Sequence, residues 1–145
     1  MQYEKIERFK CLKKINETIT RINTNKNAPQ AVGTYSQAVS AGGFLYTSGQ
    51  IGINPASGKI EVSDTKSQCL QVMNNILAIL EAKNLSLVNI IKLTVYVKDL
   101  NDFGDINDTF KDFFGGTNFP ARSTVEVAGL PLGARVEIDC IAIES

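Results

Sequence analysis

Two stretches of the chain have the hydrophobic spacing of amphipathic helices. Over residues 63–83, apolar side chains recur every three or four positions between polar ones, which places them on one helical face. Ser63 or Asp64 can cap its start, and Asn84 can take the left-handed turn at its end. Residues 101–114 predict a second helix. The apolar positions are Cys69, Val72, Met73, Ile76, Leu77 and Leu80 in the first helix and Phe103, Ile106, Phe110 and Phe113 in the second.

Short runs rich in β-branched and aromatic residues predict strands around these helices. Two of them, joined by Ala41-Gly42-Gly43, have the spacing of a hairpin. The order of strands, helix, strand, helix and strands indicates an α+β fold, with two helices on one face of a mixed sheet of about six strands. The predicted strands cover residues 18–22, 35–40, 44–52, 90–97, 121–127 and 134–143.

Such a sheet has helices on one side and leaves its other face uncovered. A small single domain seldom leaves so much apolar surface bare. We therefore expect a symmetric homo-oligomer in which the sheets of the subunits face one another.

The composition limits the kinds of site and partner that the protein is expected to have. The 145 residues, 43% of them hydrophobic, suit one domain with one core. Fifteen basic residues balance fifteen acidic ones, which argues against nucleic acid as a partner. Histidine is absent and the three cysteines lack a CxxC pair, so we expect no metal site and no disulfide framework. We predict no cofactor, no membrane partner and a reducing, cytoplasmic location.

Residues 1–18 predict an N-terminal extension, disordered or loosely docked, ahead of a domain at residues 19–145. Its apolar residues recur every three positions, a period that drifts around a helix and gives no compact stripe. Its glutamates count against an organelle transit peptide, but the sequence leaves a targeting role open.

Arg122 stands out because the rest of its predicted strand suits burial. Side chains alternate along a strand, so Arg122 and Thr124 are predicted to point away from the core, with Val125 on the core face. The same alternation turns Glu137 away from the core in the final strand. Arg122 and Glu137 are thus both expected to face away from the helices.

A surface ion pair would be the ordinary explanation of these two charges, and it would contribute little. If the surface is an oligomer interface, the guanidinium needs a partner, because burial of an unmatched charge is costly. Its planar fork suits a carboxylate or a phosphate. We therefore expect a small anionic ligand at a subunit boundary, with Glu137 orienting or deprotonating a water that attacks it.

Four segments resemble the signatures of the RidA family, also called YjgF: "NAPQAVGTYSQAV", "TSGQIGINPASGKI", "VYVKDLNDFGDINDTFKDFF" and "FPARSTVEVAGLP". The resemblance runs from about residue 19 to residue 143. It implies a chorismate-mutase-like fold and a homotrimer with sites in the clefts between subunits. The implied reaction is hydrolysis of reactive 2-imino acids, such as 2-iminobutanoate and 2-iminopropanoate, to 2-keto acids and ammonia.

The resemblance also implies roles for single residues. Arg122 would bind the substrate carboxylate, and Glu137 would position the attacking water. The other implied contacts are the pocket wall and hydroxyl of Tyr35, the hydroxyl of Ser48, the backbone of Gly49, a hydrogen bond from Asn107 and the surroundings of Thr124.

Two positions depart from the family pattern. Thr124 stands where many members have cysteine, and Thr34 stands where proline is common. A mechanism that needs a covalent thiol at position 124 is therefore excluded, whereas hydrolysis by water needs none.

Three other functions compete with the deaminase. A non-catalytic protein that binds keto or imino acids would need the same arginine, although Glu137 favours chemistry. An endoribonuclease or translation inhibitor conflicts with the balanced charge and the absence of histidine. A purely structural trimer leaves Arg122 and Glu137 unexplained.

Overall fold

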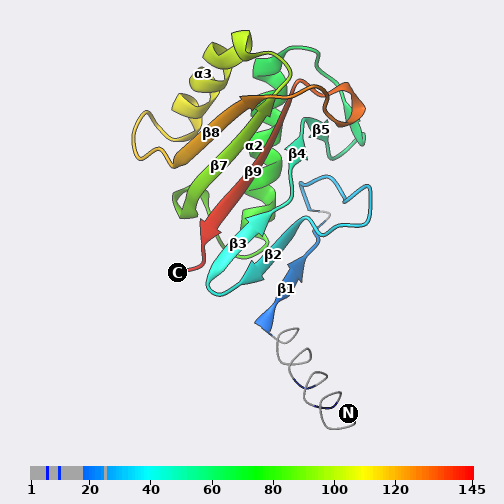
Figure 1. Ribbon diagram of the computed structural model, residues 1–145, viewed down its shortest axis with the longest axis vertical. Helices are drawn as coiled ribbons and strands as arrows, with labels where there is room; N and C mark the ends of the chain where they lie inside the picture. Colours follow the sequence, from blue (N-terminus) through cyan, green and yellow to red (C-terminus); the bar gives the residue numbers. More distant parts are fainter. Residues whose placement is uncertain (1–5, 7–9, 11–17, 25) are drawn as a thin grey trace.

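The computed structural model describes residues 6, 10, 18–24 and 26–145, so most of the predicted extension at 1–18 lies outside the described residues. A seven-stranded mixed sheet has the order β1-β2-β3-β9-β7-β8, with β4 also paired to β9 (Figure 1). The strands of this sheet are β1 (Thr20–Ile22), β2 (Ala38–Ala41), β3 (Phe44–Thr47), β4 (Gln50–Ile51), β7 (Ile90–Val97), β8 (Ala121–Glu126) and β9 (Val136–Ile143). A separate hairpin pairs β5 (Ile53–Asn54) with β6 (Lys59–Ile60).

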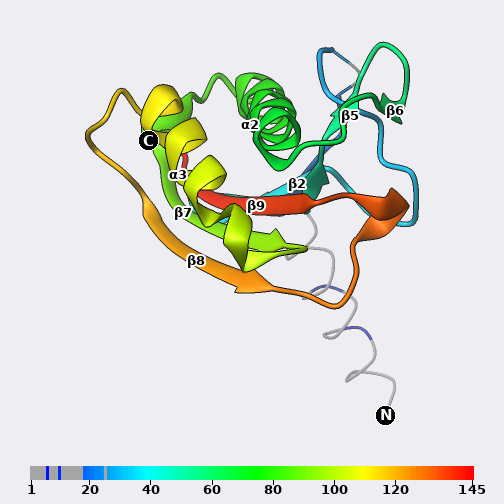
Figure 2. The ribbon, with the colours of Figure 1, turned by 90° about the horizontal axis from the view of Figure 1, so that it is seen from above.

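Helices α2 (Thr65–Glu81) and α3 (Phe103–Phe113) lie on one face of the sheet (Figure 2). The Asp64 side chain caps α2 by accepting from the Ser67 N–H at 2.8 Å. Asn84 follows with a φ of 57°, as the sequence predicts. The α+β fold is therefore confirmed. Short 3-10 turns cover η1 (Leu87–Asn89), η2 (Leu100–Asp102) and η3 (Pro131–Gly133).

Strands β7 and β8 run parallel, while the other pairs of the sheet are antiparallel. Helix α3 lies between β7 and β8 in the chain and supplies the crossover that a parallel pair requires. The core lies between the helices and the sheet. Its fully buried side chains include Leu45, Met73, Ile76, Leu93 and Ile138.

The strand predicted over residues 44–52 is interrupted. Tyr46 pairs with Ile141 and Gln50 pairs with Ile138. The segment from Tyr46 to Gln50 therefore advances four residues while its partner β9 advances three. The extra residue makes a bulge between β3 and β4, a feature that can redirect the side chains near it. The interruption places Ser48 and Gly49 between the two strands.

The face predicted for β8 is wrong. Arg122 lies in register with Leu93, and Leu93 with Cys140, both of which are buried under the helices. Val125 lies in register with Tyr96 and is 43% exposed on the opposite face. Alternation separates the two sets of side chains correctly, but it does not tell which set of a half-exposed edge strand meets the helices.

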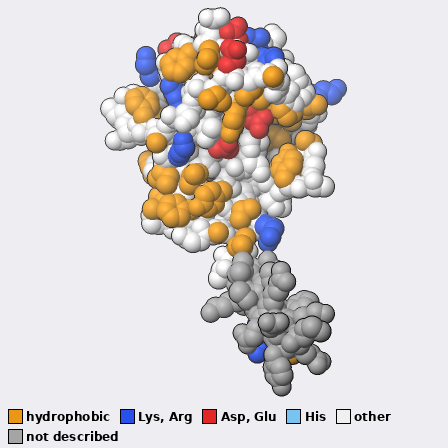
Figure 3. Space-filling view, viewed as in Figure 1, with side chains coloured by type: hydrophobic (Ala, Val, Ile, Leu, Met, Phe, Trp, Pro, Cys, Tyr) orange, Lys and Arg blue, Asp and Glu red, His pale blue; other side chains and the backbone are white. Residues whose placement is uncertain are grey.

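The two helices leave the other face of the sheet open in the described part of the chain. Apolar side chains gather on this face, in view in Figure 3, and they include Tyr46, Val125 and Ile143. The expected homo-oligomer, which would cover them, stays a prediction. No helix among the described residues is long and apolar enough to span a membrane.

Candidate functional site

The predicted site residues divide between two separate hollows. The larger hollow, of about 640 Å³, includes Tyr35, Ser48, Gly49 and Glu137 in its lining. The smaller, of about 390 Å³, includes Asn107 and Arg122. Thr124 lines neither of them.

Glu137 and Gly49 are in close contact at the floor of the larger hollow. β4 sets this contact, because Ile51 pairs with Glu137 and brings the preceding bulge against the carboxylate. A Cβ atom on Gly49 would lie 2.0 Å from Glu137 Oε1. Glycine is therefore the residue that lets Glu137 keep this position.

The Glu137 carboxyl is half-buried. Burial, and then the nearby Asp139, raise its pKa above the ordinary value. Both causes disfavour the ionised form. A carboxylate with a raised pKa is a stronger base, which is the property that proton transfer to and from water needs.

The hydroxyls of the larger hollow are already engaged in local hydrogen bonds. The Ser48 hydroxyl donates to the Ser36 carbonyl at 2.6 Å, so it offers a ligand an acceptor. The Tyr35 hydroxyl accepts from the Val32 N–H at 3.3 Å, and its own proton remains to be donated. Toward a ligand, the Ser48 hydroxyl can therefore accept a hydrogen bond and the Tyr35 hydroxyl can donate one.

Gln37, which the sequence analysis missed, supports the wall of this hollow. It is 1% exposed, and its side-chain amide donates to the carbonyls of Thr24 and Pro29. A buried amide that bonds to two loop carbonyls fixes the loop. The motif "YSQAV" contained this residue, but a glutamine inside a predicted strand gave no sign of it.

Arg122 occupies a sandwich of aromatic rings in the smaller hollow. Its Cζ lies 5.1 Å from the ring centroid of Phe103 and 5.3 Å from that of Phe110, within the range of cation–π attraction. Its Nη2 donates to Asn107 Oδ1 at 2.8 Å. Three side chains of helix α3 therefore contact the guanidinium, a role that the sequence did not assign to the aromatic residues of this helix.

Thr124 shares a strand face with Arg122, and its hydroxyl oxygen is buried without a hydrogen-bond partner in the described part of the chain. A buried polar atom without a partner costs stability. Because Thr124 lines neither hollow, its predicted contact with substrate is not visible in the single chain.

Arg122 and Glu137 do not converge within one chain. Leu93 shares a face with Arg122, and Tyr96 shares a face with Glu137. Leu93 and Tyr96 are three residues apart in β7, so they point to opposite faces of the sheet. The expectation that Arg122 and Glu137 both point away from the helices is therefore wrong for Arg122.

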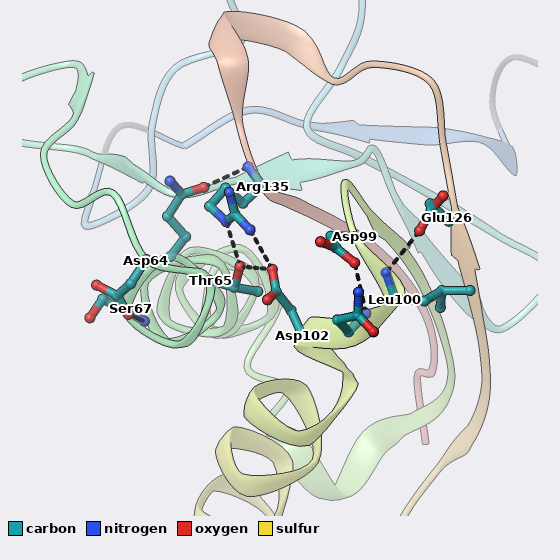
Figure 4. Close-up of polar contacts among 10 residues, drawn as sticks. Asp64, Thr65, Ser67, Asp99, Leu100, Asp102, Glu126 and Arg135 are labelled. Carbon is teal, nitrogen blue, oxygen red and sulfur yellow. Dashed lines mark hydrogen bonds and ion pairs between the residues drawn. The ribbon is translucent and has the colours of Figure 1, made fainter.

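A polar cluster joins the elements that carry the two hollows (Figure 4). Arg135, the residue before β9, donates from Nε to Thr65 Oγ1 at 2.8 Å and from Nη2 to Asp102 Oδ2 at 2.7 Å. The Thr65 hydroxyl also donates to Asp102. These bonds tie the first turn of α2 and the turn before α3 to β9. The hydrogen bond from Thr65, and then that from Arg135, lower the pKa of Asp102.

No group of three or more potential metal ligands occurs among the described residues. The thiols of Cys69 and Cys140 are also poor nucleophiles, because burial raises the pKa of each to about 12. The chemistry available in the two hollows is therefore that of a carboxylate, a guanidinium, the ammonium of Lys111, amides and hydroxyls.

Comparison with known proteins agrees with these features. The family model described as Endoribonuclease L-PSP matches residues 25–144. A 2-iminobutanoate/2-iminopropanoate deaminase of Escherichia coli K12 is 48% identical over 120 residues, which cover 81% of this chain and 93% of that protein.

Solved structures show the same fold. The YjgF gene product of E. coli has a TM-score of 0.82 at 45% identity, covering 87% of this chain and 99% of that one. E. coli TdcF with bound serine has a TM-score of 0.82 at 42% identity, with coverage of 87% and 99%. Sequence and fold together show that this chain belongs to the RidA/YjgF family, which the matching family model describes as Endoribonuclease L-PSP.

Proposed function

We propose that the protein hydrolyses small 2-imino acids, such as 2-iminobutanoate and 2-iminopropanoate, to 2-keto acids and ammonia. The active site would form between two copies of the chain. One copy would supply Arg122 and Asn107, and the next copy would supply Tyr35, Ser48, Gly49 and Glu137. The observation that carries this proposal is the placement of Arg122 and Glu137 on opposite faces of one sheet.

Two different surfaces that must meet make a heterologous contact, and such contacts close into rings when the rotation allows it. A ring of three subunits, the homotrimer that the family resemblance implies, would contain three equivalent sites. The open apolar face of each sheet, with Tyr46, Val125 and Ile143, would be covered in the same assembly.

Arg122 would bind the substrate carboxylate. Its Nη2 is engaged by Asn107, which fixes the guanidinium plane and leaves other N–H groups for a charge-assisted contact. TdcF, a structural neighbour, was solved with serine bound, and serine also carries a carboxylate beside its reactive carbon. This agrees with a small amino-acid-like ligand.

Glu137 would act as the base and then as the acid. It would take a proton from water while the water oxygen bonds to the imine carbon and the imine nitrogen gains a proton from solvent. The tetrahedral intermediate would collapse to the keto acid as Glu137 returns the proton to the nitrogen, the C–N bond breaks to release ammonia, and the hydroxyl proton leaves to solvent. A raised pKa suits both transfers near neutral pH.

Two names in the family point to different activities. The family model is described as an endoribonuclease, whereas the E. coli relative is named an imine deaminase. The formal net charge of zero and the absence of histidine argue against RNA as the substrate. An arginine for the substrate carboxylate and a glutamate for the attacking water support the deaminase.

The test is keto-acid release from imino acids generated in place by an amino-acid oxidase. We expect the wild type to accelerate release over the uncatalysed rate. Arg122→Ala and Glu137→Gln should each lose at least about 100-fold of that acceleration, while circular dichroism and the oligomer mass stay unchanged. No acceleration by the wild type, with intact binding of the keto acid, would favour the non-catalytic binding protein.

A further inference from the structure

The larger hollow has both polar and aliphatic residues in its lining. Glu137, Tyr35, Ser48 and Gly49 are the groups that the proposed reaction uses. Beside them, two loops and the strands β4 and β5 contribute aliphatic side chains, which form its aliphatic lining. These aliphatic residues are Val32, Ile51, Ile53, Pro131 and Leu132.

Leu132 is the most unusual residue of this aliphatic lining. Its φ is 54°, a left-handed conformation that is unfavourable for a leucine. Its side chain is also 70% exposed, so burial within the described chain does not offset that strain. A strained residue at the edge of a site is often kept for its function.

Val32 reaches the same hollow from a loop a hundred positions earlier in the chain, and it is 75% exposed. Two exposed aliphatic side chains on separate loops thus line one hollow that also contains the candidate catalytic carboxylate. Isolated exposed apolar residues need no explanation, but two such residues that line the same hollow as a candidate catalytic group do need one.

Local hydrogen bonds hold both loops in place. The Val32 N–H donates to the Tyr35 hydroxyl at 3.3 Å. On the other side, the Ala134 N–H donates to the Pro131 carbonyl at 3.0 Å. The Arg135 N–H donates to Gln68 Oε1 at 2.8 Å, which fixes the residues after Leu132 on helix α2. A surface held in this way can discriminate between ligands.

We propose that this aliphatic lining, with Leu132 and Val32, binds the substrate side chain and selects 2-imino acids with a long aliphatic side chain. The inference rests on the proposed function, because it takes Glu137 as the position of the reacting carbon. With the carboxylate on Arg122 of the neighbouring subunit, the side chain is the remaining part of the substrate. It would extend from Glu137 toward the aliphatic residues.

The size of the hollow agrees with this assignment. In the single chain the hollow has about 640 Å³, which leaves room for a substrate side chain as well as for Arg122 of the neighbouring subunit. A methyl or ethyl side chain would leave most of the aliphatic surface in contact with water, whereas an isobutyl side chain would cover part of it. Each added methylene in an apolar pocket improves binding by about tenfold or less.

The test compares the imino acids of leucine and alanine as substrates. We expect the wild type to have a kcat/KM at least about tenfold higher for the leucine-derived compound. Leu132→Asn removes the aliphatic side chain but keeps a residue that tolerates a positive φ. It should reduce that ratio about tenfold.

Val88→Asn is the matched control, because Val88 is a 90% exposed valine that lines neither hollow. It should leave the ratio unchanged. A wild-type preference for the alanine-derived compound would overturn the inference. So would a Leu132→Asn variant that loses oligomer mass without a change in the ratio, because Leu132 would then be covered by a subunit.

Calorimetric binding of the corresponding keto acids separates this inference from the proposed function. If the wild type hydrolyses neither imino acid but binds the keto acid of leucine more tightly, and Leu132→Asn removes that preference, the selective pocket stands and the deaminase fails. If it hydrolyses both imino acids equally well, the deaminase stands and the selective pocket fails.

Discussion

Arg122 and Glu137 lie on opposite faces of the same sheet, although their strands are both neighbours of β7. Arg122 faces helix α3 and its aromatic rings, while Glu137 lines the larger hollow beside Gly49. Two groups on opposite faces cannot bind one small molecule in a single chain. The relationship makes assembly a requirement of the proposed activity, and it can be tested directly.

Mixing two inactive variants should restore activity. Arg122→Ala chains retain Glu137, and Glu137→Gln chains retain Arg122, so a boundary between them can contain one complete site. After subunit exchange of equal amounts, about a quarter of the sites should be intact. Keto-acid release before and after exchange measures this recovery. Each variant alone is the control, and a mixture that stays inactive despite exchange, shown by mass spectrometry of tagged chains, contradicts a shared site.

Gly49→Ala should reduce activity while leaving the fold intact. The added Cβ would lie 2.0 Å from Glu137 Oε1, so the carboxylate must move away from its position. We expect a loss in kcat of about tenfold or more. Gly104→Ala is the control, because nothing lies within 4 Å of its added Cβ and Gly104 is in helix α3. That change should stabilise the protein by about 0.5–1 kcal/mol without loss of activity.

Thr124→Val should stabilise the protein. The Thr124 hydroxyl is buried without a partner in the described part of the chain, and its removal relieves a desolvation cost of about 1 kcal/mol. Urea unfolding measures the difference in free energy. Thr109→Val is the matched control and should destabilise, because the Thr109 hydroxyl donates to the Asp105 carbonyl at 2.9 Å. A less stable Thr124→Val variant would show that the hydroxyl has a partner in the assembled protein.

Asp102→Asn should weaken the junction of α2, α3 and β9 at neutral pH and have less effect in acid. The pKa of Asp102 is lowered from 3.8 by the Thr65 hydrogen bond and by Arg135. Its contribution is therefore complete above pH 3.8 and is lost as the pH falls through the lowered value. Because both side chains are partly exposed, we expect a loss of about 1 kcal/mol.

Thermal unfolding of wild type and Asp102→Asn at pH 7 and pH 3 measures this dependence. Asp112→Asn, an exposed carboxylate on α3, should change stability little at either pH. A difference between wild type and Asp102→Asn that stays constant from pH 7 to pH 3 would contradict the assigned pKa direction.

Much of the fold was predictable because local patterns specify it. The spacing of apolar residues located both helices, and Asp64 and Asn84 marked the two ends of the first. A run of β-branched residues located β7 at residues 90–97. The interruption between β3 and β4 was not predictable. It depends on pairing with β9, which is about ninety residues away in the chain.

The candidate site was likewise predictable only in part. The sequence alone singled out Arg122 and Glu137, because a guanidinium and a carboxylate in final strands suited to burial need a chemical reason. It did not reveal Gln37, the aromatic sandwich around Arg122, or the cluster of Arg135, Thr65 and Asp102.

The sequence by itself determined which segments become helices and strands, and which residues can bind an anion or move a proton. These properties follow from local spacing and from side-chain chemistry. Only the tertiary structure decided that Arg122 meets α3 while Glu137 meets the bulge at Gly49. The physical reason is that alternation along a strand fixes relative directions, while packing against distant elements decides which direction is covered.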